Sequence, residues 1–185
     1  MCALTPKYTI VHEKRRPANT PAEATEAALF LLTHGADPTI ATYEGWTSLY
    51  ALALHCCLDV RGKMADLVTK FIALGVDPET RASLASPARK LTDDDVSVPW
   101  GHRLAKAVMR NSSSSMKRMV VQPNLTPLHW AAQRGAVGVV KALLAAGVDV
   151  TVLDMNGMSA AAMAFEVKAV PMLAEAADAI VGLLF

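Results

Sequence analysis

Few side chains in this sequence have the types and spacing that chemistry requires. His55, Cys56 and Cys57 stand together, but zinc sites use Cys-x-x-Cys pairs and no second pair follows, so we interpret the trio as structural. The one acidic run, Asp93-Asp-Asp95, could hold a cation, although a solvated turn that caps a helix explains it more simply. No Gly-x-Ser-x-Gly, phosphate-binding glycine loop or His-Glu-x-x-His occurs. The sequence therefore predicts no enzyme, no cofactor and no metal.

The composition points to closely packed helices. The chain has 185 residues, of which 52% are hydrophobic, and it contains 32 alanines but only ten aromatic residues. Alanine favours helices and lets them approach closely, whereas β-sandwiches need β-branched and aromatic residues. This length suits one domain with a core of its own.

Charge gives little reason to expect nucleic acid. The formal net charge is +1. A stretch from Val96 to Val148 has seven basic residues and no acidic one, but these lack the interleaved aromatics on which bases stack. The stretch includes Asn111-Ser-Ser-Ser-Ser115, which a basophilic kinase could modify at Ser112–Ser115. A solvated spacer is the simpler interpretation. The basic residues are Arg103, Lys106, Arg110, Lys117, Arg118, Arg134 and Lys141.

The cysteines and the apolar segments suggest a compartment. Three cysteines cannot form a disulfide framework, and the first residues contain no apolar stretch of the kind found in a signal peptide. No run of eighteen uncharged apolar residues occurs. We expect a cytoplasmic protein, with the nucleus as the alternative.

One short pattern recurs along the chain. Apolar helical runs end at Gly35, Gly75 and Gly147, and each glycine is followed two residues later by aspartate. Glycine readily adopts the left-handed conformation with which helices commonly end. Thr126 and Ser159, two candidate helix caps, are 33 residues apart. A period of this length predicts a stack of repeated helical units.

The segment from Asn124 to Gly147 carries the strongest form of the pattern. Asn124-Leu-Thr-Pro-Leu-His-Trp-Ala-Ala-Gln-Arg-Gly135 is followed by Val139-Val-Lys-Ala-Leu-Leu-Ala-Ala-Gly147. This segment resembles an ankyrin repeat. Thr126 and Pro127 would start the first helix, and a second helix would run from about Val137 to Ala146. The resemblance implies an all-α ankyrin-repeat solenoid, in which helix-turn-helix units stack and short hairpin-like loops connect them.

The other units are predicted from spacing. We expect a flexible tail over residues 1–20 and an ankyrin-repeat domain of about four to five units over residues 21–185. The first unit would supply only a second helix, Ala22 to His34. In the next, Thr47 and Gly75 are seven residues further apart than Thr126 and Gly147, and the extra residues are placed near His55 to Lys63. Between Gly75 and Thr126 lie enough residues for a degenerate unit, at 82–119. A final helix would cover Met172 to Phe185.

The resemblance also implies a function. Ankyrin repeats bind partner proteins through loop tips and the concave face of the first helices, with His129 in a structural role. We therefore predict an adaptor or scaffold module with an unidentified protein partner, a monomer if the stack is capped. The alternative is a structural segment that stacks on further repeats of a larger protein. The matching partner-binding positions are Tyr43, Glu44, Trp46, Leu54, His55, Gln122, Leu125, Gln133, Arg134, Met155, Asn156 and Met158.

Overall fold

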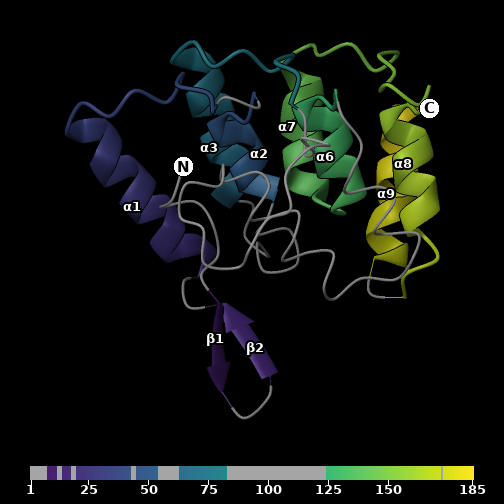
Figure 1. Ribbon diagram of the computed structural model, residues 1–185, viewed down its shortest axis with the longest axis horizontal. Helices are drawn as coiled ribbons and strands as arrows, with labels where there is room; N and C mark the ends of the chain where they lie inside the picture. The colour runs from purple at the N-terminus through teal and green to yellow at the C-terminus, as the bar shows by residue number, and fades with distance from the viewer. Residues whose placement is uncertain are drawn as a thin grey trace, which may run out of the picture.

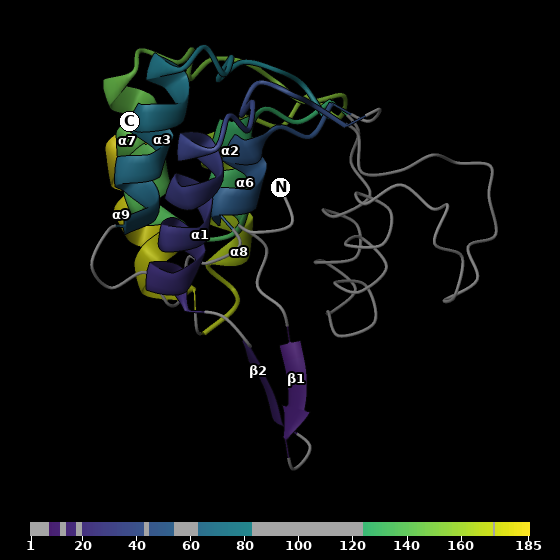
Figure 2. The same cartoon turned by 90° about the vertical axis from the view of Figure 1, so that its left-hand side faces the viewer.

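The computed structural model describes residues 8–11, 14–17, 20–42, 45–53, 63–82, 124–171 and 173–185. Its helices form two layers (Figures 1 and 2). The inner layer contains α2 (Ser48–Leu52), α6 (Pro127–Gln133) and α8 (Ala160–Val167). The outer layer contains α1 (Pro21–Thr33), α3 (Lys63–Ala73), α7 (Val137–Ala145) and α9 (Ala174–Leu184). These bounds agree closely with the helices predicted at Ala22–His34, Val137–Ala146 and Met172–Phe185.

Local signals explain where the helices begin. The Thr126 hydroxyl accepts a hydrogen bond from the His129 backbone N–H at 3.4 Å, and Pro127 occupies the first helical position, where its missing N–H costs nothing. Thr20 and Pro21 start α1 in the same way, and there the Glu23 carboxylate accepts the Thr20 N–H at 2.7 Å. The predicted Thr-Pro start of α6 is confirmed.

Two strands lie before α1. β1 (Tyr8–Val11) and β2 (Lys14–Pro17) pair in an antiparallel hairpin, with Tyr8 opposite Pro17. The hairpin extends below the lower end of α1 (Figure 1). The sequence analysis expected a tail here and did not predict this pairing, since alternation of apolar and polar residues over so few positions is a weak signal.

A cluster of large aromatic side chains joins the inner helices at their centre. The rings of Trp46 and Trp130 meet edge to face, with centroids 5.2 Å apart, and neither side chain is exposed. The ring of Tyr50 packs against that of Trp46. The backbone carbonyl oxygen of Tyr50 accepts the Trp130 indole N–H at 3.0 Å. Buried aromatic pairs contribute beyond their apolar area, so this cluster ties α2 firmly to α6.

The loops that lead into the inner helices share one geometry. Thr42, Ala82 and Asp154 each stand seven residues after a helix-ending glycine, and each donates its backbone N–H to a carbonyl further along the chain. The acceptors belong to Trp46, Leu125 and Met158, at 2.8 to 2.9 Å. We name the three turns hairpin A (42–46), hairpin B (82–125) and hairpin C (154–158).

Hairpin B contains an insertion. Three residues separate Asp154 from Met158, whereas 42 separate Ala82 from Leu125, an excess of 39. Gly75 and Gly147 are 72 residues apart, which also exceeds the 33-residue period by 39. Ala82 and Leu125 nevertheless pair through two hydrogen bonds, of 2.8 and 3.0 Å, and so close the base of the hairpin. The 39 extra residues therefore fall, in the sequence, between the two residues that close hairpin B.

The described helices bear on where the predicted degenerate unit at 82–119 could stand, and the unit itself stays a prediction. α3 packs directly on α7, and α2 on α6, so no further unit is stacked between them. The 51 residues from Gly75 to Thr126 suggest an extra repeat, because this number is only slightly larger than the length of one loop and one 33-residue period. Most of the proposed unit lies outside the described residues.

Candidate functional site

Two of the inner helices, α2 and α6, are each tied to the hairpin of the next unit by one side chain in the same position. Tyr50 and His129 each stand three residues after the threonine that precedes their helix. The Tyr50 hydroxyl lies 2.6 Å from the Leu125 carbonyl oxygen and 2.7 Å from that of Thr80. The His129 Nε2 lies 3.1 Å from the Met158 carbonyl oxygen. Since Leu125 and Met158 occupy the same position of their hairpins, tyrosine replaces histidine in one structural role.

The tautomer of His129 follows from its contacts. Its Nδ1 faces the Thr126 backbone N–H at 3.4 Å, which can only donate. The neutral ring must then carry its proton on Nε2 and donate it to the Met158 carbonyl. Burial lowers the pKa of His129 below its usual value and so favours this neutral form. His129 is thereby a structural tie, as the sequence analysis proposed.

Further contacts link the loops to one another across the stack. The Arg81 guanidinium donates to the Leu153 carbonyl oxygen at 3.2 Å and lies 3.5 Å from that of Asn124. The Glu79 carboxylate accepts the Asp149 backbone N–H at 2.8 Å. The loops that lead into hairpins B and C are thus held together by Glu79 and Arg81, both of which precede the insertion.

Hairpin C is fixed by a buried carboxylate. One Asp154 oxygen accepts the backbone N–H groups of Asn156 and Met158, both at 2.8 Å, and the other lies 3.3 Å from the Asn156 amide nitrogen. Charged hydrogen bonds of this kind are among the stronger ones in proteins. The exposed side chains of Leu153, Met155 and Asn156 therefore project from a turn whose backbone is already set.

The comparison with known families agrees with this geometry. The family model of the ankyrin repeat matches residues 124–155, which cover α6, α7 and the start of hairpin C. Residues 124–155 are an ankyrin repeat. No curated protein matches the chain in sequence. The same loop hydrogen bond recurs in hairpin A, outside the matched segment, and at the base of hairpin B.

Three of the predicted partner-binding residues are buried in the helical stack. Trp46 belongs to the aromatic cluster, Leu125 closes hairpin B, and Gln133 ends α6. Each has at most 1% of its surface exposed, so none can serve as a surface contact. The sequence placed them on the surface because it showed their register in the repeat but not what lies against them.

The exposure of the concave face differs between the inner helices. Every residue of α2 and α6 is buried, so the predicted binding face is closed at these two inner helices. α8 differs, because Phe165 and Glu166 are exposed there. Phe165 has the register position that Ala132 occupies in α6; Phe165 is 66% exposed and Ala132 not at all.

Four predicted partner-binding residues reach the surface at least in part. Met155 and Asn156 are exposed, and Met158 and Arg134 are half-buried. The Arg134 guanidinium lies 5.5 Å from the Trp130 ring centroid, in a cation–π contact. The other five lie outside the described residues: Tyr43, Glu44, Leu54, His55 and Gln122. So do Cys56, Cys57, the acidic run and the serine run.

The structure adds exposed residues that the sequence analysis missed. Ile40 and Leu153 are apolar and exposed on the loops, and Arg81 joins them there. We call Ile40, Arg81, Leu153, Met155 and Asn156 the loop edge; these loops run along the upper side of Figure 1. A comparison of the equivalent loop positions of the units in the sequence would have found them, because apolar residues in tight turns are rarely buried.

Two further kinds of site were sought in the described part of the chain. No group of three His, Cys, Asp or Glu side chains there is arranged to hold a metal ion. None of the helices described is long and apolar enough to cross a membrane.

Proposed function

We propose that this ankyrin-repeat chain binds a partner protein through the loop edge, as an adaptor or scaffold. Ankyrin repeats are protein-interaction modules in general, and the observation that favours the loop edge is the preorganised hairpin C. Asp154 sets its backbone while Met155, 67% exposed, stands free above it. A surface that is already ordered loses little entropy on binding.

The chemistry of the loop edge indicates the kind of partner surface. Leu153 and Met155 offer apolar contact, and methionine adapts to uneven surfaces. Asn156 adds an exposed amide, and Arg81 a cation whose guanidinium already reaches the Leu153 carbonyl. We therefore expect a partner surface that is mainly apolar at its centre, with an acceptor or carboxylate opposite Arg81.

The first test is photo-crosslinking of the partner protein from position 155. A photoreactive amino acid at Met155 should crosslink one discrete protein in cell extract, whereas the same group at Thr69, exposed on α3, should not. With that partner purified, Met155→Asp should weaken binding at least about tenfold, because a buried contact gains a charge. Calorimetry measures the affinities.

Thr69→Asp is the matched control, since it adds the same charge on the convex side. It should bind like the unaltered chain and should melt at the same temperature. The proposal is wrong if Met155→Asp binds as tightly as the unaltered chain, or if both variants lose affinity equally.

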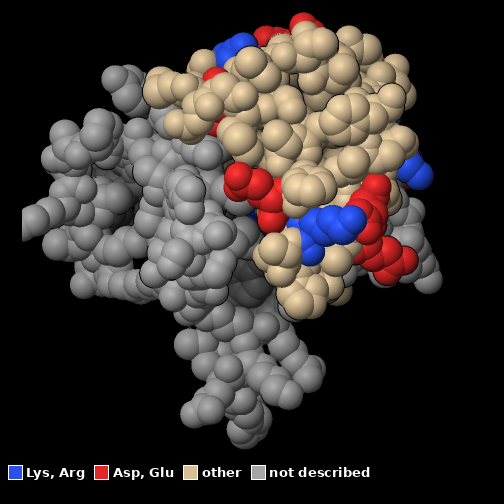
Figure 3. All heavy atoms as spheres, turned by 90° about the vertical axis from the view of Figure 1, so that its right-hand side faces the viewer, with Lys and Arg blue, Asp and Glu red and all other residues tan. Residues whose placement is uncertain are grey.

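The alternative function, stacking on further repeats, is favoured by the end face formed by α8 and α9. Most of the described part of this face is uncharged (Figure 3). An ion pair of 2.6 Å joins Lys168, at the end of α8, to Asp178 of α9. Phe165 of α8 and Leu183 of α9 are both exposed. If this alternative holds, a photoreactive amino acid at position 165 should crosslink the partner, and one at position 155 should not.

A further inference from the structure

The outer helix α1 has an apolar face that its counterparts bury. Leu31, Phe71 and Leu143 each stand four residues before a helix-ending glycine. Phe71 and Leu143 are 2% and 0% exposed, but Leu31 is 43% exposed. One turn earlier, Ala27 is half-buried where its counterparts Leu67 and Val139 are buried.

The difference has a structural cause. α3, α7 and α9 each pack against the inner helix of their own unit, namely α2, α6 and α8. Among the described residues no inner helix precedes α1, which stands at the end of the stack (Figure 1). The face of Ala27 and Leu31 is therefore the surface that an inner helix covers everywhere else in this fold.

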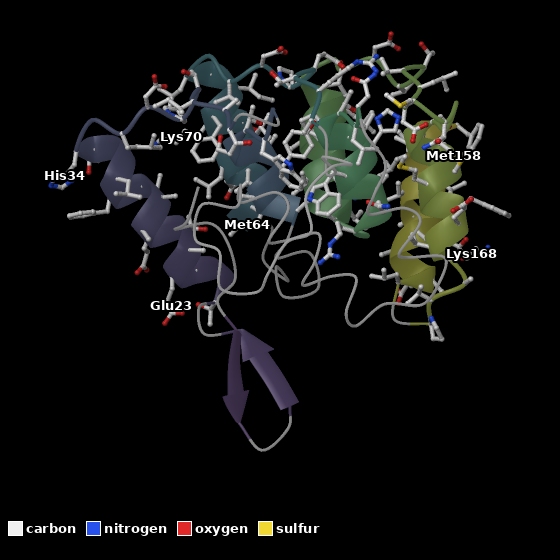
Figure 4. The ribbon with its side chains drawn as sticks, in the orientation of Figure 1. Glu23, His34, Met64, Lys70, Met158 and Lys168 are labelled. Carbon is white, nitrogen blue, oxygen red and sulfur yellow. The ribbon has the colours of Figure 1, made fainter. Side chains whose placement is uncertain are left out.

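The charges on α1 indicate what could cover it. Its only charged residues are Glu23 and Glu26, both exposed in its first half. Hydrogen bonds from Thr20 lower the pKa of Glu23 and keep it ionised. At the other end the rings of Phe30 and His34 stack with centroids 4.0 Å apart. Figure 4 shows Glu23 and His34 at opposite ends of the helix.

We infer that α1 binds an amphipathic helix of a partner protein, with small apolar residues along one stripe and Lys or Arg in its last turn. Inner and outer helices joined by a short loop run antiparallel, so the last turn of the bound helix would lie beside Glu23 and Glu26. Basic residues there meet both glutamates and also suit the negative end of the helix dipole. This surface is separate from the loop edge, and the inference does not depend on the proposed function.

The probe is a helix-stabilised synthetic peptide of 13 residues, the length of α1. It carries Ala and Leu at positions i, i+3, i+4 and i+7 and lysines in its last turn; a second peptide carries glutamates there instead. Fluorescence anisotropy measures the binding of each to the full chain. The lysine peptide should bind, and the glutamate peptide should bind several-fold more weakly.

Variants locate the contact. Leu31→Glu should weaken the binding of the lysine peptide at least about tenfold, because it places a charge on the apolar face of α1. Glu26→Lys leaves Glu23 in place and brings the charge of the first half of α1 from −2 to 0, so the preference for the lysine peptide should be lost. Lys70→Glu, on the exposed side of α3, is the control and should change neither affinity. Circular dichroism checks that each variant keeps its helices.

Three results would overturn the inference. The first is an absence of saturable binding by either peptide, and the second is equal binding by Leu31→Glu and the unaltered chain. The third is a dimer of the chain in analytical ultracentrifugation that Leu31→Glu abolishes, because the occupant of the stripe is then a second copy. None of these results bears on the loop edge.

Discussion

Replacing Trp130 with alanine is expected to lower the free energy of unfolding by about 3–5 kcal/mol, the usual cost of truncating a buried aromatic side chain. Trp130 is fully buried, packs edge to face on Trp46 and donates its indole N–H to the Tyr50 carbonyl. The substitution removes the ring contact and leaves the buried carbonyl without this donor. Denaturant unfolding followed by circular dichroism measures the change.

Phe165→Ala is the matched control, since it also truncates an aromatic residue of an inner helix. Its side chain is mostly exposed, so the free energy of unfolding should change by less than about 1 kcal/mol. Trp130→Phe keeps most of the ring volume and allows a measurement if the alanine variant does not fold. Equal effects of Trp130→Ala and Phe165→Ala would contradict the aromatic cluster as the joint between α2 and α6.

Gly45→Ala should destabilise the stack by at least about 2 kcal/mol, through backbone strain and a steric clash acting together. Gly45 has φ +85°, a conformation that residues with a side chain rarely adopt. A methyl group there would also lie 2.1 Å from the Arg81 carbonyl oxygen, so the backbone itself would have to move. A thermal melt or a denaturant titration measures the loss.

Gly157→Ala separates the two causes. Gly157 has the same place in hairpin C and φ +74°, but nothing lies within 4 Å of the added methyl group. Only the conformational cost, about 1 kcal/mol, should remain. If both alanine variants lost the same stability, the close approach of hairpin A to Arg81 would not hold.

The sequence predicted the fold well where each helix carries its own signals. Thr126 and Pro127 start α6, and Gly147 ends the helix that follows, because capping and left-handed turns depend on neighbouring residues alone. α1, which ends before Gly35, was predicted for the same reason, whereas α9 was predicted from the spacing of the units. These signals require no knowledge of what packs where.

The errors concern contacts between distant residues. The spacing of Gly75 and Thr126 shows how many residues intervene but not where they enter the stack. The pairing of Ala82 with Leu125 decides that, and it joins residues 43 positions apart. A local signal was present, since Ala82 stands as far after its glycine as Asp154 does. Asn124, at φ 71°, marks the turn position that Gly45 and Gly157 hold.

The candidate site was predicted only in part for the same physical reason. Trp46 and Gln133 are types that could serve a surface or a core, and only the packing of neighbouring units decides between them. Met155 and Asn156 were predicted correctly as exposed, because a three-residue turn cannot enter the core. Their role in binding remains a prediction.

We propose that the described helices form one continuous stack, in which the residues between Ala82 and Leu125 are an insertion into hairpin B. The most direct test replaces residues 83–124 with Met-Asn-Gly, the three residues of hairpin C at 155–157. Trp100 leaves with the insertion, so tryptophan fluorescence then reports only on Trp46 and Trp130. The account predicts a helical chain with blue-shifted emission and one cooperative unfolding transition. A chain that aggregates, or that unfolds without cooperativity and with exposed tryptophans, would contradict it.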